Sequence, residues 1–183
     1  MKLLDILLEV ASDVDKSSDK SVHGKLFSTR LKSIAKALGV STSNLLRIME
    51  FESGMDPAAT NKMGSGARGL IQFMPATAME IWGISADQIA TLSAYDQLLY
   101  VYGYYQKNNL PKGADLGDMY LTTIYPAAIK LNLPDTFVVG KEGSPETKYK
   151  VNLGKFYKQN PTFDTTGKKE ITVGDIRKYI TSK

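Results

Sequence analysis

The most informative segment of the chain is a run of mostly apolar residues that ends in a glycine: Asn44-Leu45-Leu46-Arg47-Ile48-Met49-Glu50-Phe51-Glu52-Ser53-Gly54. Its apolar residues recur three and four positions apart, which predicts an amphipathic helix from about 44 to 51. Successive helical residues are rotated by ~100°, so Glu52 falls in the middle of the apolar face, with Ile48 and Met49. Glu50 falls on the opposite face. The helix therefore directs one carboxyl group inward.

An inward carboxyl group at the end of a helix has two interpretations. Apolar surroundings raise the pKa of a carboxyl group, because desolvation disfavours its charged form. A general acid that works near neutral pH needs such a pKa. Alternatively, the helix frays before residue 52 and Glu52 faces water. The helical phase alone leaves both interpretations open.

A segment rich in small residues follows this helix: Asn61-Lys62-Met63-Gly64-Ser65-Gly66-Ala67-Arg68-Gly69-Leu70-Ile71-Gln72-Phe73-Met74-Pro75. Small residues let the backbone approach a ligand closely and expose main-chain hydrogen-bonding groups. Gln72 adds a side-chain donor and an acceptor, which suit hydroxyl and N-acetyl groups. The segment predicts either a ligand-binding loop or a tight turn between two helices.

Together, these two segments resemble the signature of the soluble lytic transglycosylases, which are lysozyme-like enzymes of glycoside hydrolase family 23. The resemblance rests on Glu52-Ser53-Gly54 followed by Gly66-Ala67-Arg68-Gly69-Leu70-Ile71-Gln72-Phe73-Met74-Pro75-Ala76-Thr77-Ala78. Order, residue types and intervening distance all match. Ser65, inserted just before the second motif, resembles the variant in phage-encoded members. The similarity is closest over 44–80, extends over 93–130, and is weak at both ends of the chain.

The resemblance implies roles for individual residues. Glu52 is the implied catalytic acid and base, Ser53 supports the acid or the sugar, and Gln72 contacts the substrate at the cleft. The family's later Ala-Tyr-Asn motif has its nearest match in Thr123-Ile124-Tyr125-Pro126-Ala127. Tyr125 therefore inherits the hydrogen bond to the glutamate, whereas Pro126 stands where the family has asparagine.

The implied reaction needs one carboxyl group. A two-carboxylate glycosidase requires a second Asp or Glu at a fixed separation, and none occurs between Pro57 and Met79. In the family's reaction, Glu52 protonates the oxygen between N-acetylmuramic acid and N-acetylglucosamine. It then acts as base while the 6-hydroxyl attacks C1, which leaves a 1,6-anhydro sugar. Peptidoglycan glycan strands are thus the expected substrate, without a metal or an organic cofactor.

The composition limits other chemistries. The 183 residues contain no cysteine and one histidine, which excludes disulfides, thiolate sites and clusters of imidazole ligands and weakens triad mechanisms. Residues 164–175 have the length and central isoleucine of a calcium loop. Lys168 and Lys169, however, occupy the positions where a ligand and a glycine are expected. We therefore expect a turn there, with Thr172 capping the last helix through Asp175.

The hydrophobic patterns predict a mainly α protein, a lysozyme-like helical domain with a small β-hairpin at most. Residues 1–22 are expected to form an amphipathic helix and linker, 23–135 the lysozyme-like transglycosylase domain, and 136–183 a basic extension packed on it. Further predicted helices cover 28–38, 75–81, 93–107, 115–129 with a break at Pro126, and 173–180. Predicted strands cover 136–140 and 148–153.

Charge is distributed unevenly along the chain. Residues 141–183 hold ten Lys or Arg and five Asp or Glu, whereas the first 140 residues have a net charge of −1. A basic tail suggests attraction to a polyanion, and an acidic cell-wall polymer fits as well as a nucleic acid does. Charge alone favours a third interpretation, a basic face that is simply solvated. No nucleic-acid partner is expected, because the tail lacks a dense basic run with interleaved aromatics.

The start of the chain has no recognisable signal peptide, since Asp5 and Glu9 interrupt its apolar run. No stretch reaches the ~20 apolar residues of a membrane span. These features predict a protein in a phage virion, or in the host cytoplasm before release to the cell wall, with phage structural proteins as further partners. Two alternatives stay open: a goose-type lysozyme-like hydrolase that uses water, and a non-catalytic virion or wall-binding protein.

Overall fold

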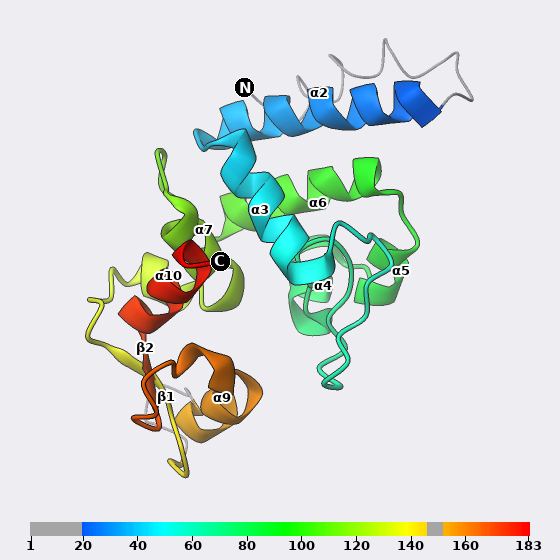
Figure 1. The fold of residues 1–183 in the computed structure, drawn as a ribbon. Helices are drawn as coiled ribbons and strands as arrows, with labels where there is room; N and C mark the ends of the chain where they lie inside the picture. Colours follow the sequence, from blue (N-terminus) through cyan, green and yellow to red (C-terminus); the bar gives the residue numbers. More distant parts are fainter. Residues whose placement is uncertain (1–19, 146–151) are drawn as a thin grey trace. The chain divides into compact units, whose positions relative to one another are not determined.

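The structure, a computed structural model, describes residues 20–145 and 152–183. The chain divides into two compact units, the first ending at Asp115 and the second running from Leu116 to Lys183 (Figure 1). The predicted helix and linker at the start of the chain lie outside the described residues, apart from the first turn of α2. The domain boundaries that the sequence indicates, after residues 22 and 135, stay predictions.

The described part of the first unit is helical. It comprises α2 (Lys20–Leu38), α3 (Thr42–Ser53), α4 (Pro75–Trp82), α5 (Ala86–Ala90) and α6 (Ala94–Lys107). Figure 1 shows α2 and α6 side by side, and these two helices pack together. α2 also contacts α3, while α4 contacts α5 and α6. This arrangement confirms the predicted helices and extends α2 by eight residues at its start.

Local signals explain where these helices begin and end. α2 stops before Gly39, whose φ of 72° is in the left-handed region that ends helices. Ser85 and Gln88 form a capping box at the start of α5, and the Ser93 hydroxyl caps α6. The core between the helices is apolar, and its fully buried members include Ile34, Leu45, Ile48, Met49, Leu98, Val101 and Tyr105.

The second unit combines short helices with a small sheet. Its elements are α7 (Leu116–Ile124), α8 (Ala127–Lys130), β1 (Val138–Lys141), α9 (Leu153–Gln159), the 3-10 helix η1 (Pro161–Phe163), β2 (Glu170–Thr172) and α10 (Val173–Thr181). The predicted break at Pro126 is confirmed, because Pro126 separates α7 from α8. The reciprocal bonds of Thr172 and Asp175 cap α10 as predicted.

The sheet of the second unit differs from the predicted hairpin. β1 pairs antiparallel with β2, with Gly140 opposite Ile171 and an irregularity next to it. Residues 148–151 of the predicted second strand lie outside the described residues, and Leu153 begins α9. Ile171 is fully buried, so β2 contributes an apolar side chain to the core of this unit before α10 begins.

The loop that resembles a calcium loop forms the expected turn. The Asp164 carboxylate accepts hydrogen bonds from the backbone N–H groups of Lys168 (3.0 Å) and Lys169 (2.7 Å), and from the Tyr157 hydroxyl (3.0 Å). Lys169 pairs in turn with Glu142 at 2.8 Å. The Asp164 carboxylate thus already accepts hydrogen bonds from groups of the protein. The ion pair with Glu142 neutralises part of the basic charge of this segment.

Candidate active site

Glu52 lies within the last turn of α3. The helix runs to Ser53 and ends at Gly54, whose φ is 62° and whose N–H donates to the carbonyl of Glu50. The alternative in which the helix frays before residue 52 is therefore wrong. Ile48 is fully buried, Glu50 is exposed and Glu52 is half-buried. The helical phase thus turns Glu52 away from the solvent face, as the sequence predicts.

Ser53 connects α3 to the glycine-rich loop. Its hydroxyl lies 2.8 Å from the carbonyl oxygen of Met49, one turn earlier, and 3.0 Å from that of Leu70. Both groups are acceptors, so the hydroxyl proton is directed at the backbone. The residue after Glu52 is thereby bonded to the segment that carries Gln72.

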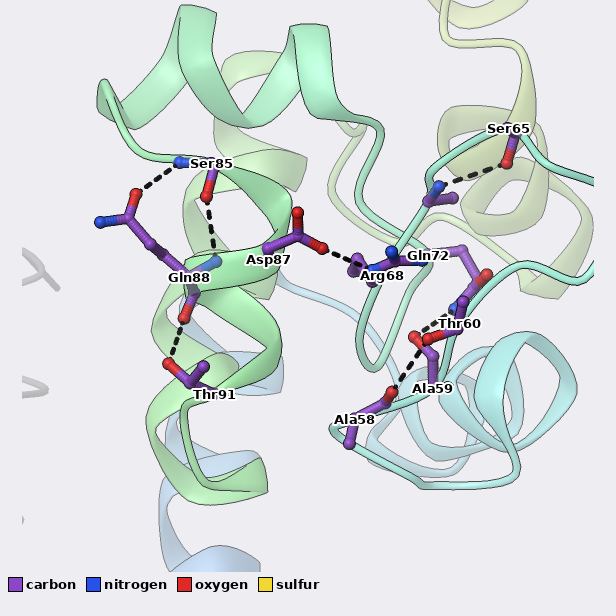
Figure 2. Close-up of polar contacts among 11 residues, drawn as sticks. Ala58, Ala59, Thr60, Ser65, Arg68, Gln72, Ser85, Asp87, Gln88 and Thr91 are labelled. Carbon is purple, nitrogen blue, oxygen red and sulfur yellow. Dashed lines mark hydrogen bonds and ion pairs between the residues drawn. The ribbon is translucent and has the colours of Figure 1, made fainter.

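The loop from 57 to 75 is irregular but closed by its own backbone. The N–H of Asn61 donates to Ala67 (3.0 Å), and Arg68 and Phe73 exchange both of their backbone bonds (2.7 and 3.1 Å). The Arg68 guanidinium also pairs with Asp87 of α5 at 2.7 Å, as Figure 2 shows. The backbone bonds close the loop on itself, and the ion pair joins it to α5.

Gln72 sits at the tip of this closed turn in an unusual backbone conformation. Its φ is 53°, in the left-handed region, and its side-chain Nε2 donates to the carbonyl of Gly69 at 3.1 Å. A longer contact of 3.5 Å joins Nε2 to the Ala59 carbonyl (Figure 2). In the described part of the chain, its side-chain oxygen accepts no hydrogen bond.

A cluster of aromatic rings packs around Phe73 of the loop. Phe73 is 1% exposed and meets Trp82 and Tyr104 edge to face, at centroid distances of 5.5 and 6.4 Å. Trp82 continues to Tyr100 at 5.1 Å, and Tyr104 to Tyr105 at 5.7 Å. Edge-to-face pairs of this kind contribute about 0.5–1.5 kcal/mol each beyond their burial. Through Phe73, the loop thus contributes a side chain to the core of the first unit.

Tyr104 also links the aromatic cluster to Glu52. Burial, and after it the negative charge of Glu52, raises the pKa of the Tyr104 hydroxyl. The phenol therefore keeps its proton at neutral pH, close enough to Glu52 to respond to its charge. Sequence reasoning did not single out Tyr104, because its place on the buried face of α6 is also that of an ordinary core residue.

The influence of Glu52 on Tyr104 can be measured. In Glu52→Gln we expect the pKa of Tyr104 to fall, because the neutral amide no longer opposes formation of the tyrosinate. It should stay above the ordinary tyrosine value, since burial is the larger cause. An alkaline NMR titration of ring-labelled tyrosine would follow the resonance. Glu50→Gln, on the exposed face, should leave it unchanged, and an unchanged or higher pKa in Glu52→Gln would contradict the coupling.

Tyr125 belongs to the second unit. It follows α7, with its N–H bonded to Leu121 at 2.8 Å, and its ring packs edge to face on Phe156 at 5.7 Å. Burial raises the pKa of its hydroxyl. Its hydrogen bond to Glu52, which the family resemblance implies, stays a prediction.

Comparison with known families gives one match, over about a third of the chain. Residues 31–95 match the family model described as "Transglycosylase SLT domain". The matched stretch contains Glu52, Ser53 and Gln72, and ends before Tyr104. No curated protein gives a significant match to the chain.

The match supports a domain of the lytic transglycosylase and lysozyme-like type. It suggests that the protein is an enzyme that acts on peptidoglycan. Together with the helical architecture it confirms the predicted fold class, a mainly helical lysozyme-like domain with a small β element. Among residues 20–145 and 152–183, no group of three or more acidic or histidine side chains could hold a metal ion. No helix within the same residues has the length and apolarity needed to cross a bilayer.

Proposed function

We propose that the protein is a peptidoglycan lytic transglycosylase of glycoside hydrolase family 23, with Glu52 as its single acid and base. The observation that carries this proposal is the half-buried carboxyl group at the end of α3, held beside a loop that matches the family motif. A partly desolvated carboxyl group suits proton transfer in both directions, because its protonated form is less disfavoured than in water.

The reaction uses Glu52 twice. Glu52 first gives its proton to the glycosidic oxygen between N-acetylmuramic acid and N-acetylglucosamine, and the bond from that oxygen to C1 of the muramic acid breaks. The substrate's own N-acetyl group stabilises the positive charge that develops at C1. The Glu52 carboxylate then takes the proton of the muramic acid 6-hydroxyl, whose oxygen attacks C1. The product has a 1,6-anhydro end, and Glu52 regains its proton.

The surroundings of Glu52 favour this one-carboxylate reaction. Asp56, the nearest acidic residue along the loop, is exposed, and its carboxylate accepts the N–H of Ala58 at 2.8 Å. The next twenty-three residues, 57–79, contain no Asp or Glu. A nucleophilic carboxylate would have to come from a segment distant in the sequence, whereas the 6-hydroxyl is already part of the substrate.

Ser53 and Gln72 take complementary roles in this proposal. The Ser53 hydroxyl faces backbone carbonyls, which favours supporting the acid over binding the sugar. The side-chain oxygen of Gln72 accepts no bond from the described residues, so it suits a hydroxyl or N–H donor of the glycan. Tyr125 is proposed as an additional partner of Glu52.

The products decide between transglycosylation and hydrolysis. We expect digestion of purified peptidoglycan to release fragments with 1,6-anhydro-N-acetylmuramic acid ends, identified by mass spectrometry as 18 Da lighter than hydrolytic products because no water is added. Reducing ends instead would indicate the goose-type hydrolase. If cell walls in a turbidity assay do not clear at all, the protein is a non-catalytic wall-binding or virion component.

We also propose that the enzyme is phage-encoded and acts from the virion or after release from the host cytoplasm. Ser65, the residue that resembles the phage variant, has its hydroxyl oxygen bonded to the N–H of Ala67 at 3.2 Å (Figure 2). The insertion is therefore accommodated within the loop. Immunodetection of the chain in purified particles would test the virion location.

A further inference from the structure

Gln97 is a polar side chain in the apolar core of the first unit. It lies in the first turn of α6 and is 0% exposed. Burying an amide is unfavourable unless its hydrogen bonds to water are replaced. Both the oxygen and the nitrogen of the Gln97 amide have protein partners. Its Oε1 accepts the N–H of Leu70 at 2.9 Å. Its Nε2 donates to the carbonyls of Pro57 (2.7 Å) and Ile89 (2.9 Å), with Leu92 at 3.3 Å.

The partners of Gln97 come from three separate segments. Pro57 lies in the loop that leaves α3 just after Glu52, and Leu70 belongs to the turn that carries Gln72. Ile89 lies in α5. The carbonyl of Leu70 accepts the Ser53 hydroxyl, and its N–H donates to Gln97, so Leu70 is bonded both to the end of α3 and to α6. One side chain therefore fixes both stretches of chain next to the proposed acid.

The space around Gln97 fits this role. A Cβ atom added at Gly69 would lie 2.5 Å from Oε1 of Gln97, and the φ of Gly69 is 76°. The turn can therefore approach the amide only because residue 69 has no side chain. Leucine at position 97 would leave the N–H of Leu70 and the carbonyl of Pro57 without partners, and glutamate could not donate in place of the Nε2 group.

We propose that Gln97 is a positioning residue for the active site: its buried amide sets the place of the Leu70–Gln72 turn and of the loop after α3 relative to Glu52. This inference rests on the proposed function only for its effect on catalysis. Gln97 touches no substrate and acts through Ser53, Leu70 and Gln72. The matched family region ends at residue 95, so the proposal concerns a residue beyond it.

The test compares Gln97→Leu with Ile34→Val, a core variant in α2 that leaves the amide intact. In Gln97→Leu we expect kcat on glycan fragments to fall about 100-fold, because a displacement of about 1 Å at a catalytic site can reduce the rate by this much. KM should change much less. Hydrogen exchange of the peptide covering 57–72 should accelerate, while exchange in α2 stays as in the wild type. Ile34→Val should show neither effect.

A second pair of variants keeps the test valid if Gln97→Leu does not fold. Gly69→Ala places a methyl group against the amide. The control is Gly113→Ala, because Gly113 has the same φ of 76°, has nothing within 4 Å of an added Cβ atom and lies outside the loop. Only Gly69→Ala should lower kcat and loosen 57–72. The proposal would be overturned if kcat of the test variant equals that of its control variant, or if hydrogen exchange in 57–72 is the same as in the wild type. If the wild type cleaves no glycan, the proposed function fails, and the exchange measurement still decides whether Gln97 holds the loop.

Discussion

Replacing Glu52 with glutamine should remove nearly all glycan-cleaving activity, a loss of about 10²- to 10⁴-fold if general acid–base catalysis supplies its usual share. Glutamine has nearly the same shape as glutamate but can neither give nor take the proton. The half-buried position of Glu52 at the end of α3 lets the amide replace the carboxyl group without a change in helix packing. Clearing of purified cell walls, followed by turbidity, measures the effect.

Glu50→Gln is the matched control for this experiment. Glu50 belongs to the same helix two residues earlier and is exposed, so its substitution removes an equal charge from the opposite side. We expect Glu50→Gln to keep wild-type activity and both variants to keep the far-ultraviolet circular dichroism of the wild type. Activity of Glu52→Gln near that of the wild type would refute the single-glutamate mechanism.

The second large effect concerns stability. Phe73→Ala should lower the free energy of unfolding by about 3–5 kcal/mol, the range for truncating a buried phenylalanine. Phe73 is 1% exposed and its ring meets both Trp82 and Tyr104. The substitution therefore removes the ring contacts between the glycine-rich loop and helices α4 and α6. Activity should fall together with stability.

Urea unfolding followed by tryptophan fluorescence suits this measurement, because Trp82 is the single tryptophan of the chain and lies in the affected cluster. Phe51→Ala provides the control: Phe51 is 39% exposed on α3, so the same truncation there should cost far less. Equal losses in the two variants would mean that Phe73 does not connect the loop to the core.

Elements defined by neighbouring residues could be predicted from the sequence. The stop of α2 at Gly39, the capping box of Ser85 and Gln88, and the break at Pro126 each depend on side chains within a few positions of the boundary. The pairing of β1 with β2 could not be predicted in this way. It joins strands about thirty residues apart, and it depends on the burial of Ile171 in a core that no local pattern describes.

The candidate site was predictable to a similar extent. Helical phase predicted the inward direction of Glu52 on the condition that the helix reaches residue 52, whereas the proposed roles of Ser53 and Gln72 required a family resemblance. Gln97 was missed although the same phase argument applies to it. It shares a face of α6 with Val101 and Tyr104, four and seven residues later, which are buried. The sequence could not predict which carbonyl groups accept hydrogen bonds from the Gln97 amide, because they belong to other segments of the chain.

The backbone of Gln72 has a consequence for how this domain can change. Its left-handed φ of 53° is unfavourable by roughly 1–2 kcal/mol for a residue with a side chain, and glycine would relieve this strain. Selection for heat resistance alone should therefore enrich glycine at position 72 and remove the side chain proposed to bind the glycan. Persistence of glutamine at position 72 under such selection would instead indicate that its side-chain hydrogen bond to the Gly69 carbonyl outweighs the backbone strain.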